Sequence, residues 1–146
     1  MGRSYSFVVP ITPVGKARTR TVTRNGKTHS YTPEKTLQAE ERIAWEFSLL
    51  IHLPFAEAYP AFPGSEPVSM VVTAYSPRPK TCPKTRIMPV VVPDVDNLGK
   101  TIMDALNGWA YYDDKQITTL LVRKRYGSPA RLEITLSEDT EEVTND

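Results

Sequence analysis

The chain has 146 residues, 40% of them hydrophobic, which favours one globular domain over two. No long apolar run and no signal-peptide pattern is present, so we expect a cytoplasmic protein without a membrane-spanning segment. The net charge of +1 hides a segregation, because residues 1–136 carry all 18 Lys and Arg, whereas residues 137–146 carry five acidic residues and no basic one. We therefore assign residues 1–136 to a single domain and residues 137–146 to an acidic tail with the composition of a disordered segment.

The first part of the chain predicts a strand and then a basic hairpin. The strand covers Tyr5–Val9 and ends at a proline-containing loop. No acidic residue follows before Glu34, and Asn25-Gly26 is the strongest short signal for a two-residue hairpin. Such a protruding ribbon can lie along DNA phosphates, or it can simply be a solvated hairpin. The basic side chains expected on it are Lys16, Arg18, Arg20, Arg24 and Lys27.

A helix of about 18 residues is predicted next, with Thr32 as N-cap and Pro33 at its first position. Its apolar residues recur at helical spacing, and we interpret this face as core rather than dimer surface. Residues 52–67 contain four prolines and predict an irregular loop, and residues 68–75 predict a central strand. The apolar face of the helix comprises Leu37, Ala44, Phe47 and Ile51, widened by Trp45 and Leu50.

The segment 76–89 has four basic residues, four prolines and no acidic residue, which predicts an extended loop. Its basic side chains are candidates for phosphate contacts, and we select Lys80, Lys84 and Arg86. Cys82 has no histidine or second cysteine near it in the sequence, so we interpret it as incidental.

The most informative stretch is 93–116, which holds five of the 17 carboxylates of the chain. Asp94 and Asp96 follow the apolar run 90–92, and their side chains share one face if the chain is extended there. A second acidic pair, Asp113 and Asp114, precedes a predicted strand over 116–126. Carboxylates that converge repel one another unless a divalent cation neutralises them, and oxygen ligands suit Mg²⁺ or Mn²⁺.

A short helix should connect the two acidic pairs. Asn97 is a suitable N-cap, and Gly108 lies just past the end of a helix of about three turns. Asp96, Lys100 and Asp104 then lie one above another at four-residue spacing. The last strand is predicted over 130–137, after a turn at 127–129.

Each acidic residue also has a simpler interpretation. Asp113 and Asp114 could be turn residues, and Asp104 could be a solvated helix residue. Asp96 could belong to a helix cap together with Asn97. These alternatives involve no metal ion.

Two other metals fit the sequence less well. The only cysteine, Cys82, and the only histidines, His29 and His52, lack the paired spacing of a zinc site. The segment DVDNLG begins like an EF-hand calcium loop. However, Leu98 replaces the ligand at loop position five and Ala105 replaces the glutamate at position twelve.

In this stretch the chain resembles the RusA family of Holliday-junction resolvases. The family motif D-x-D-N-L-x-K matches residues 94–100, D-A-L matches 104–106, and D-D-x-Q-[IV] matches 113–117. The flanking order of a strand, a basic loop, a helix, a middle strand and a final strand pair also agrees. The resemblance implies that Asp94, Asp96 and Asp114 bind the metal ion and that Lys100 is essential for cleavage. The proline-rich segments 52–67 and 77–92 are longer than in compact bacterial members.

The predicted elements make an α+β domain with a mixed sheet, one long helix and one short helix. The resemblance implies a Mg²⁺- or Mn²⁺-dependent endodeoxyribonuclease that resolves four-way DNA junctions by paired nicks as a homodimer, in recombination and repair, without an organic cofactor. We interpret Asp104 and Asp113 as residues that orient Lys100 or a metal-bound water. Two alternatives stay open: a junction-binding protein that does not cleave, and a nuclease for other branched or flap DNA.

Overall fold

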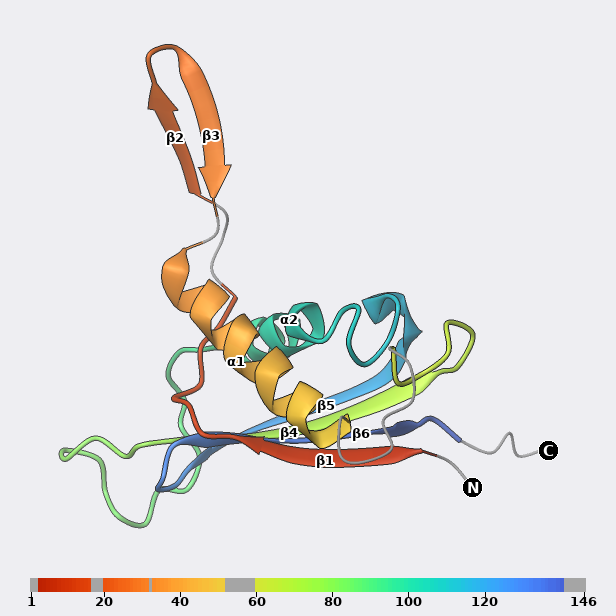
Figure 1. Cartoon of the computed structure of the whole chain (residues 1–146). Helices are drawn as coiled ribbons and strands as arrows, with labels where there is room; N and C mark the ends of the chain where they lie inside the picture. Colours follow the sequence, from red (N-terminus) through yellow and green to blue (C-terminus); the bar gives the residue numbers. More distant parts are fainter. Residues whose placement is uncertain (1–2, 17–19, 32, 52–59, 141–146) are drawn as a thin grey trace, which may run out of the picture.

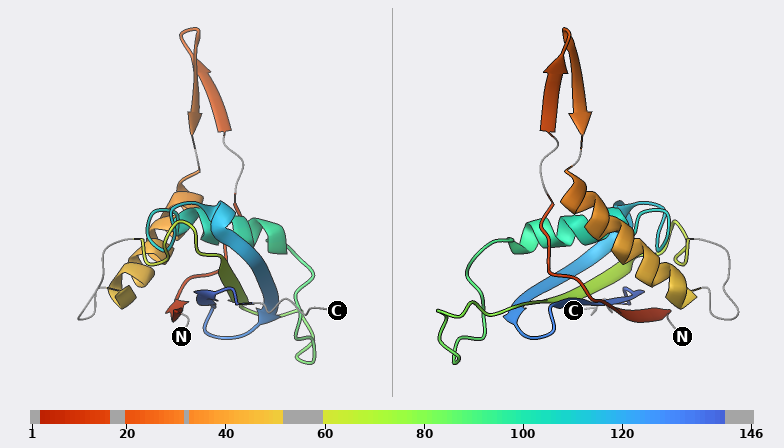
Figure 2. Two further views of the ribbon diagram at one scale, coloured as in Figure 1. Left: turned by 90° about the vertical axis from the view of Figure 1, so that its right-hand side faces the viewer. Right: turned by 60° about the vertical axis from the view of Figure 1, so that its left-hand side comes forward.

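The computed structural model describes residues 3–16, 20–31, 33–51 and 60–140. Four strands form one sheet, and two further strands form a separate ribbon that projects from the body (Figure 1). Two α-helices lie on the same face of the four-stranded sheet (Figures 1 and 2). The elements are β1 (Ser4–Val9), β2 (Arg20–Arg24), β3 (Lys27–Tyr31), α1 (Glu34–Ile51), β4 (Val68–Ser76), α2 (Val95–Ala105), β5 (Ile117–Tyr126) and β6 (Arg131–Glu138).

The four-stranded sheet is mixed and has the order β1-β6-β4-β5. β6 pairs antiparallel with β1 and β4, whereas β5 pairs parallel with β4. The predicted α+β class and the central position of β4 are therefore confirmed. β5 and β6 follow one another in the chain but do not pair. The β4–α2–β5 crossover places β5 parallel to β4 on one side of β4. β6 pairs with the other side of β4 and lies between β4 and β1.

The core lies between the sheet and the helices. Alternate residues of β4 are buried, and the aromatic ring of Phe47 in α1 packs edge-on against Tyr5 of β1 at 5.8 Å between ring centroids. The predicted core position of Phe47 is correct, but Leu37 and Trp45 are 43% and 58% exposed. The stripe that faces the sheet includes Ala39, Ile43 and Phe47, and Leu37 and Trp45 lie off this stripe around the helix.

Helix α2 begins three residues earlier than predicted. Its N-cap is Asp94, whose carbonyl accepts the amide of Leu98 at 3.0 Å, so the prediction of Asn97 as N-cap is wrong. The preceding run 90–92 forms no strand, and Val90 and Val92 are 81% and 82% exposed. A β-branched run becomes a strand only where it pairs with another strand, and this run pairs with neither edge strand of the sheet, β1 or β5. Contrary to the prediction, Asp94 and Asp96 therefore do not lie on one face of a strand; they lie at the N-cap and in the first turn of α2.

The predicted hairpin is present. β2 and β3 pair antiparallel around Asn25 and Gly26, both of which have positive φ (51° and 75°), as a two-residue turn of this type requires. The N-cap predicted at Thr32 lies outside the described residues. Pro33 directly precedes α1, rather than being its first residue, and its carbonyl accepts the amide of Leu37 at 3.2 Å.

The sheet extends past the predicted domain boundary at residue 136. β6 continues through Glu138, and the amide of Asp139 donates to the carbonyl of Pro67 at 2.9 Å. Residues 141–146 of the predicted tail lie outside the described part of the chain. Neither of the two described α-helices is long and apolar enough to cross a membrane.

Candidate active site

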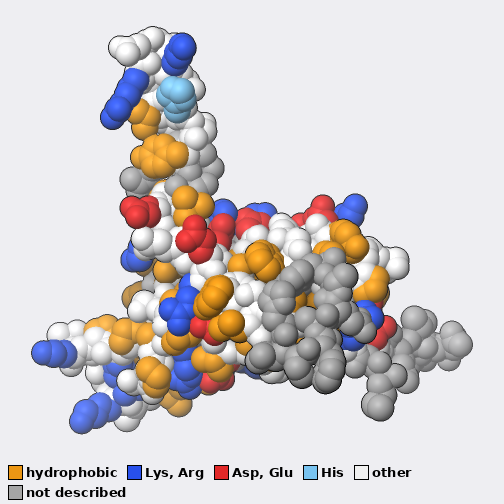
Figure 3. Space-filling view, in the orientation of Figure 1, with side chains coloured by type: hydrophobic (Ala, Val, Ile, Leu, Met, Phe, Trp, Pro, Cys, Tyr) orange, Lys and Arg blue, Asp and Glu red, His pale blue; other side chains and the backbone are white. Residues whose placement is uncertain are grey.

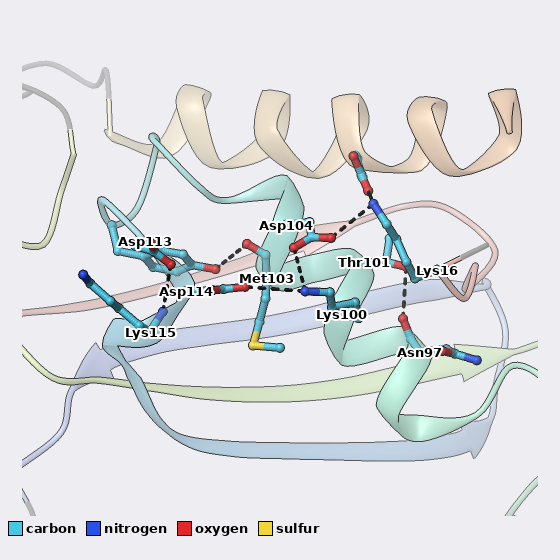
Figure 4. Close-up of polar contacts among 11 residues, drawn as sticks. Lys16, Asn97, Lys100, Thr101, Met103, Asp104, Asp113, Asp114 and Lys115 are labelled. Atoms are coloured by element: carbon cyan, nitrogen blue, oxygen red, sulfur yellow. Dashed lines mark hydrogen bonds and ion pairs between the residues drawn. The ribbon is translucent and has the colours of Figure 1, made fainter. Parts of the chain in front are cut away.

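Two lysines from distant segments share the carboxylate of Asp104 (Figure 4). Lys100 Nζ lies 3.4 Å from Asp104 Oδ1, one helical turn further along α2, as the four-residue spacing predicts. Lys16 Nζ lies 3.1 Å from Asp104 Oδ2 and donates a hydrogen bond to Glu40 Oε1 of α1. The Asp104 side chain is only 22% exposed. The interpretation of Asp104 as a solvated helix residue is therefore wrong.

Lys100 also connects α2 to the second acidic pair. Its Nζ lies 3.8 Å from Asp114 Oδ2, and both groups are labelled in Figure 4. The Lys100 side chain is 52% exposed, whereas that of Asp114 is 30% exposed. Both distances from Lys100 to its carboxylates exceed those of strong charge-assisted hydrogen bonds. The ammonium group is thus loosely held and accessible from solvent.

Asp113 caps a single 3₁₀ turn formed by Asp114–Gln116. Its carboxylate accepts the amide of Lys115 at 3.1 Å, and the side chain of Gln116 reaches back to accept the amide of Asp113 at 3.3 Å. This reciprocal capping box confirms the turn interpretation for Asp113 and presents Asp114 at the start of the turn.

Gln116 holds this turn against the body and was not singled out from the sequence. Its Nε2 donates to the carbonyls of Pro63 at 2.7 Å and Glu66 at 3.1 Å, and its Oε1 accepts the amide of Tyr112 at 2.9 Å. The residue is only 6% exposed, so these hydrogen bonds take the place of hydrogen bonds to water. A glutamine three residues after a capping aspartate is a readable signal for this arrangement.

Two further positioning residues also emerge only from the structure. Tyr111 is fully buried and donates its hydroxyl to the carbonyl of Met103 in α2 at 2.7 Å, which connects the segment before the acidic turn to the helix. Burial, with smaller effects of Asp114 and Asp104, raises the pKa of Tyr111, so the hydroxyl stays protonated as a donor. Glu40 carries no local sequence signal, because its role depends on how α1 packs against α2.

The two carboxyl groups of the second acidic pair influence one another. A side-chain hydrogen bond with Asp113, together with burial, raises the pKa of Asp114, although the charge of Lys100 opposes the shift. The amide of Lys115 and the hydrogen bond to Asp114 lower the pKa of Asp113. Negative charge at Asp114 is therefore less favourable than at an isolated aspartate. A bound cation would relieve this cost.

Asp94 and Asp96 lie at the start of α2, and both are exposed. Neither carboxylate makes a hydrogen bond or ion pair with another described residue. The described residues contain no group of three acidic, histidine or cysteine side chains arranged to hold a metal ion. The donors present are carboxylate oxygens with access to water, which suits Mg²⁺ or Mn²⁺. Mg²⁺ commonly uses one or two carboxylates with waters and substrate phosphates, so a complete protein cage is not needed. The metal ligands Asp94, Asp96 and Asp114 stay a prediction.

The predicted DNA-binding residues before α1 separate into different places. Lys16 does not belong to the ribbon: it precedes β2 and contacts Asp104, because two carboxylates hold its ammonium group in the body. Arg18 lies outside the described residues. Arg20 begins β2, and Arg24 ends it at the exposed ribbon tip. Lys and Arg side chains are visible at this tip in Figure 3.

The basic residues of the loop after β4 are all exposed, as predicted. The loop makes two turns, in which the amides of Cys82 and Arg86 donate to the carbonyls of Pro79 and Pro83, each at 3.0 Å. Arg78 donates to the carbonyl of Arg86 at 2.6 Å and so connects the two ends of this segment. The side chains of Lys80, Lys84 and Arg86 remain available to a ligand, and their contact with DNA stays a prediction.

Comparison with known proteins identifies the family. Residues 10–137 match the family model for the endodeoxyribonuclease RusA, a range that contains Lys16, the whole of α2 and both acidic pairs. The chain is also 33% identical over 142 residues to the uncharacterized protein YqaN of Bacillus subtilis (strain 168), and the alignment covers 90% of this chain and 94% of that relative. Sequence motifs, mixed sheet and matched range agree, and the chain belongs to the RusA family of endodeoxyribonucleases.

Proposed function

We propose that this protein is a Mg²⁺- or Mn²⁺-dependent endonuclease that resolves four-way DNA junctions by paired nicks, as a homodimer. Membership of the family supports hydrolysis of DNA. The observation that carries the proposal further is Lys100, an exposed cation held loosely between Asp104 and Asp114. The junction substrate, the metal ion and the symmetric pair of cuts are the specific parts of the proposal.

Lys100 is suited to stabilise the charge that develops on a phosphate during hydrolysis. Its ammonium group is half-exposed, and distances of 3.4 and 3.8 Å to its carboxylates leave it free to shift towards a phosphate oxygen. A positive charge already placed beside the reacting phosphate lowers the barrier most when negative charge builds up in the transition state. We assign this role to Lys100.

The acidic residues around Lys100 are suited to hold a divalent cation. Asp96 and Lys100 are four residues apart in α2 and share one helix face, and Lys100 contacts Asp114. Asp96 and Asp114 thus lie on the same side of the helix, with Asp94 at its N-cap. When bound there, a Mg²⁺ or Mn²⁺ ion would supply an activated water and stabilise the leaving 3′ oxygen. Asp104 and Asp113 orient Lys100 and the acidic turn, respectively.

The ribbon has two different faces, and one of them is suited to DNA. Alternation along the paired strands places Arg24, Lys27 and His29 on one face, together with Val22 and Tyr31. The opposite face carries only hydroxyl side chains, and those of Thr23 and Thr28 lie 3.4 Å apart. Cations interleaved with an aromatic ring can contact phosphates and bases. We propose that the basic face lies against the junction.

An exposed apolar surface beside Asp94 is suited to a second copy of the chain. Val90, Val91 and Val95 are 81%, 56% and 47% exposed, and they line one hollow with Leu121 of the outer strand β5 and with Asp94. Apolar side chains gathered in this way favour burial in an interface. A two-fold contact here would bring two acidic sites near one another. Such an arrangement matches the two opposed strands that paired nicks require.

The deciding experiment incubates the purified protein with labelled four-way, three-way, flap and linear duplex DNA, with Mg²⁺, with Mn²⁺ and with EDTA. We expect metal-dependent cutting that is fastest on the four-way junction and symmetric across it. Faster cutting of flaps or three-way DNA would support the nuclease for other branched DNA. Tight junction binding without cutting in either metal would support the non-cleaving alternative.

A further inference from the structure

We propose that Lys16 is a positioning residue for Lys100, acting through Asp104, and not a phosphate contact. The inference rests on the proposed function, because it takes Lys100 as the cation that meets the reacting phosphate. Lys16 belongs to the segment between β1 and the ribbon, far from Lys100 in the sequence. The three side chains nevertheless form one chain of contacts, from Lys16 through the two oxygens of Asp104 to Lys100 (Figure 4).

The charge of Lys16 is used within the protein. Its ammonium group contacts Asp104 and Glu40, whose side chains are 22% and 19% exposed, and the Lys16 side chain is itself only 26% exposed. Burial alone would lower the pKa of Lys16, but hydrogen bonds to Glu40 and Asp104 outweigh it and raise the pKa above its ordinary value. A contact with a phosphate would require Lys16 to leave both carboxylates. Lys100 is held less closely, because its side chain is 52% exposed and its ammonium group lies 3.4 and 3.8 Å from its two carboxylates.

The backbone fixes Lys16 in this place. Its amide donates to the carbonyl of Asn97 in the first turn of α2 at 3.1 Å. Gly15 packs so closely on α2 that an added Cβ would lie 3.0 Å from Pro93 Cβ and 3.2 Å from Asn97 Cβ. The segment is therefore pressed onto the helix that carries Lys100, and the Lys16 side chain runs along this helix to Asp104.

Lys16 affects Lys100 in two ways. By binding Oδ2 of Asp104 it sets the orientation of the carboxylate and hence the position of Oδ1, which holds Lys100. Its positive charge also offsets part of the charge of Asp104, so Lys100 is attracted less strongly and can move to a phosphate. Without Lys16, Asp104 can turn both oxygens to Lys100 and hold it away from the substrate. We therefore expect slower cleavage with unchanged DNA binding.

The test compares Lys16→Met with Lys27→Met, a matched control that removes one exposed lysine from the ribbon. At saturating protein, single-turnover cleavage of a four-way junction by Lys16→Met should fall at least about tenfold, as expected when a reacting group is misplaced. Its salt dependence of binding should stay that of the wild type. Lys27→Met should instead reduce this slope by about one charge, because Lys27 lies on the exposed basic face of the ribbon. A reduced slope with unchanged cleavage in Lys16→Met would overturn the inference.

Two further variants isolate the path through Asp104. Asp104→Asn alone should slow cleavage, and the double variant Lys16→Met/Asp104→Asn should be no slower than Asp104→Asn, because both changes act on one interaction. Independent, multiplicative losses would overturn the inference. If Lys16→Met does not fold, Glu40→Gln loosens Lys16 from the side of α1 instead. This variant should also lower the cleavage rate at wild-type salt slope, and an unchanged rate would count against the proposal.

A readout without catalysis separates this inference from the proposed function. In ¹⁵N NMR of the lysine ammonium groups, Lys16→Met should shift the Lys100 signal, and Lys27→Met should leave it unchanged. If the wild type cuts none of the DNA substrates, the proposed function fails. The response of the Lys100 signal to Lys16→Met still tests whether Lys16 acts on Lys100. A Lys100 signal that does not respond to Lys16→Met would overturn the inference even in an active enzyme.

Discussion

Lys100 and Asp114 come from different elements, and their charged atoms lie 3.8 Å apart at the surface of the molecule. α2 supplies the lysine, and the capped turn before β5 supplies the carboxylate. This pair connects α2 to the acidic turn before β5. The contact is long and the lysine is half-exposed, so Lys100 can leave Asp114 when a substrate binds.

Asp96→Asn should abolish cleavage in Mg²⁺ and in Mn²⁺, while junction binding stays the same or becomes tighter. The change removes a proposed metal ligand, and it also removes a negative charge near the phosphates, which cannot weaken affinity for DNA. Gel-shift affinity and cutting are measured on the same junction. Glu41→Gln, an exposed acidic residue of α1, is the matched control. Cutting at the wild-type rate by Asp96→Asn would remove this residue from the site.

Lys100→Arg should lower the single-turnover rate of cleavage by about 10² or more, because a planar guanidinium is longer than an ammonium and can bind a neighbouring carboxylate bidentately. Asp104 and Asp114 lie within reach on either side. Junction affinity should hardly change, since one cation replaces another. Near-wild-type cutting would show that Lys100 is only a diffuse phosphate contact.

Arg24→Ala/Lys27→Ala should weaken junction binding and reduce the slope of log K against log salt by up to about two charges. Both side chains are exposed on the basic face of the ribbon. Thr21→Ala/Thr28→Ala changes the opposite face and should leave the slope unaltered. Equal slopes for the two double variants would show that the ribbon is a solvated hairpin that does not contact DNA.

Val91→Asp should convert a dimer to a monomer and reduce paired cutting. Val91 is 56% exposed within the apolar surface beside Asp94, and two copies of an aspartate facing one another across a two-fold interface repel. Val8→Asp, at 49% exposure on β1, is the control for an exposed valine elsewhere. Light scattering after size-exclusion chromatography gives the mass. A wild-type monomer at all concentrations would contradict the proposed homodimer.

Gln116→Leu should destabilise the fold by about 1–3 kcal/mol for each buried polar group that loses its partner. The side chain satisfies the carbonyls of Pro63 and Glu66 and two amides of the acidic turn, and the residue is 6% exposed. Urea unfolding measures the change in the free energy of unfolding. Lys115→Ala, a change of an exposed neighbour, should leave it nearly unaltered. Equal stability of both variants would show that water replaces the lost hydrogen bonds.

Elements with local signals can be predicted from the amino-acid sequence. Asn25-Gly26 predicted the hairpin because few residues other than these accept positive φ at both turn positions. The four-residue spacing of Lys100 and Asp104 predicted their contact because it follows from helix geometry alone. The largely apolar stretch 68–75 likewise predicted a central strand, and the motif residues predicted the family to which the chain belongs.

Contacts between segments that are distant in the sequence could not be predicted, because they form only in the folded chain. The run 90–92 has the composition of a strand, yet it pairs with no strand of the sheet and stays exposed. Lys16 looked like part of the ribbon because the charge pattern of that segment is continuous. Its position depends on the packing of α1 on α2, which brings Glu40 and Asp104 to the same ammonium group. No local pattern encodes such a contact, because its energy comes from groups that meet only in the folded chain.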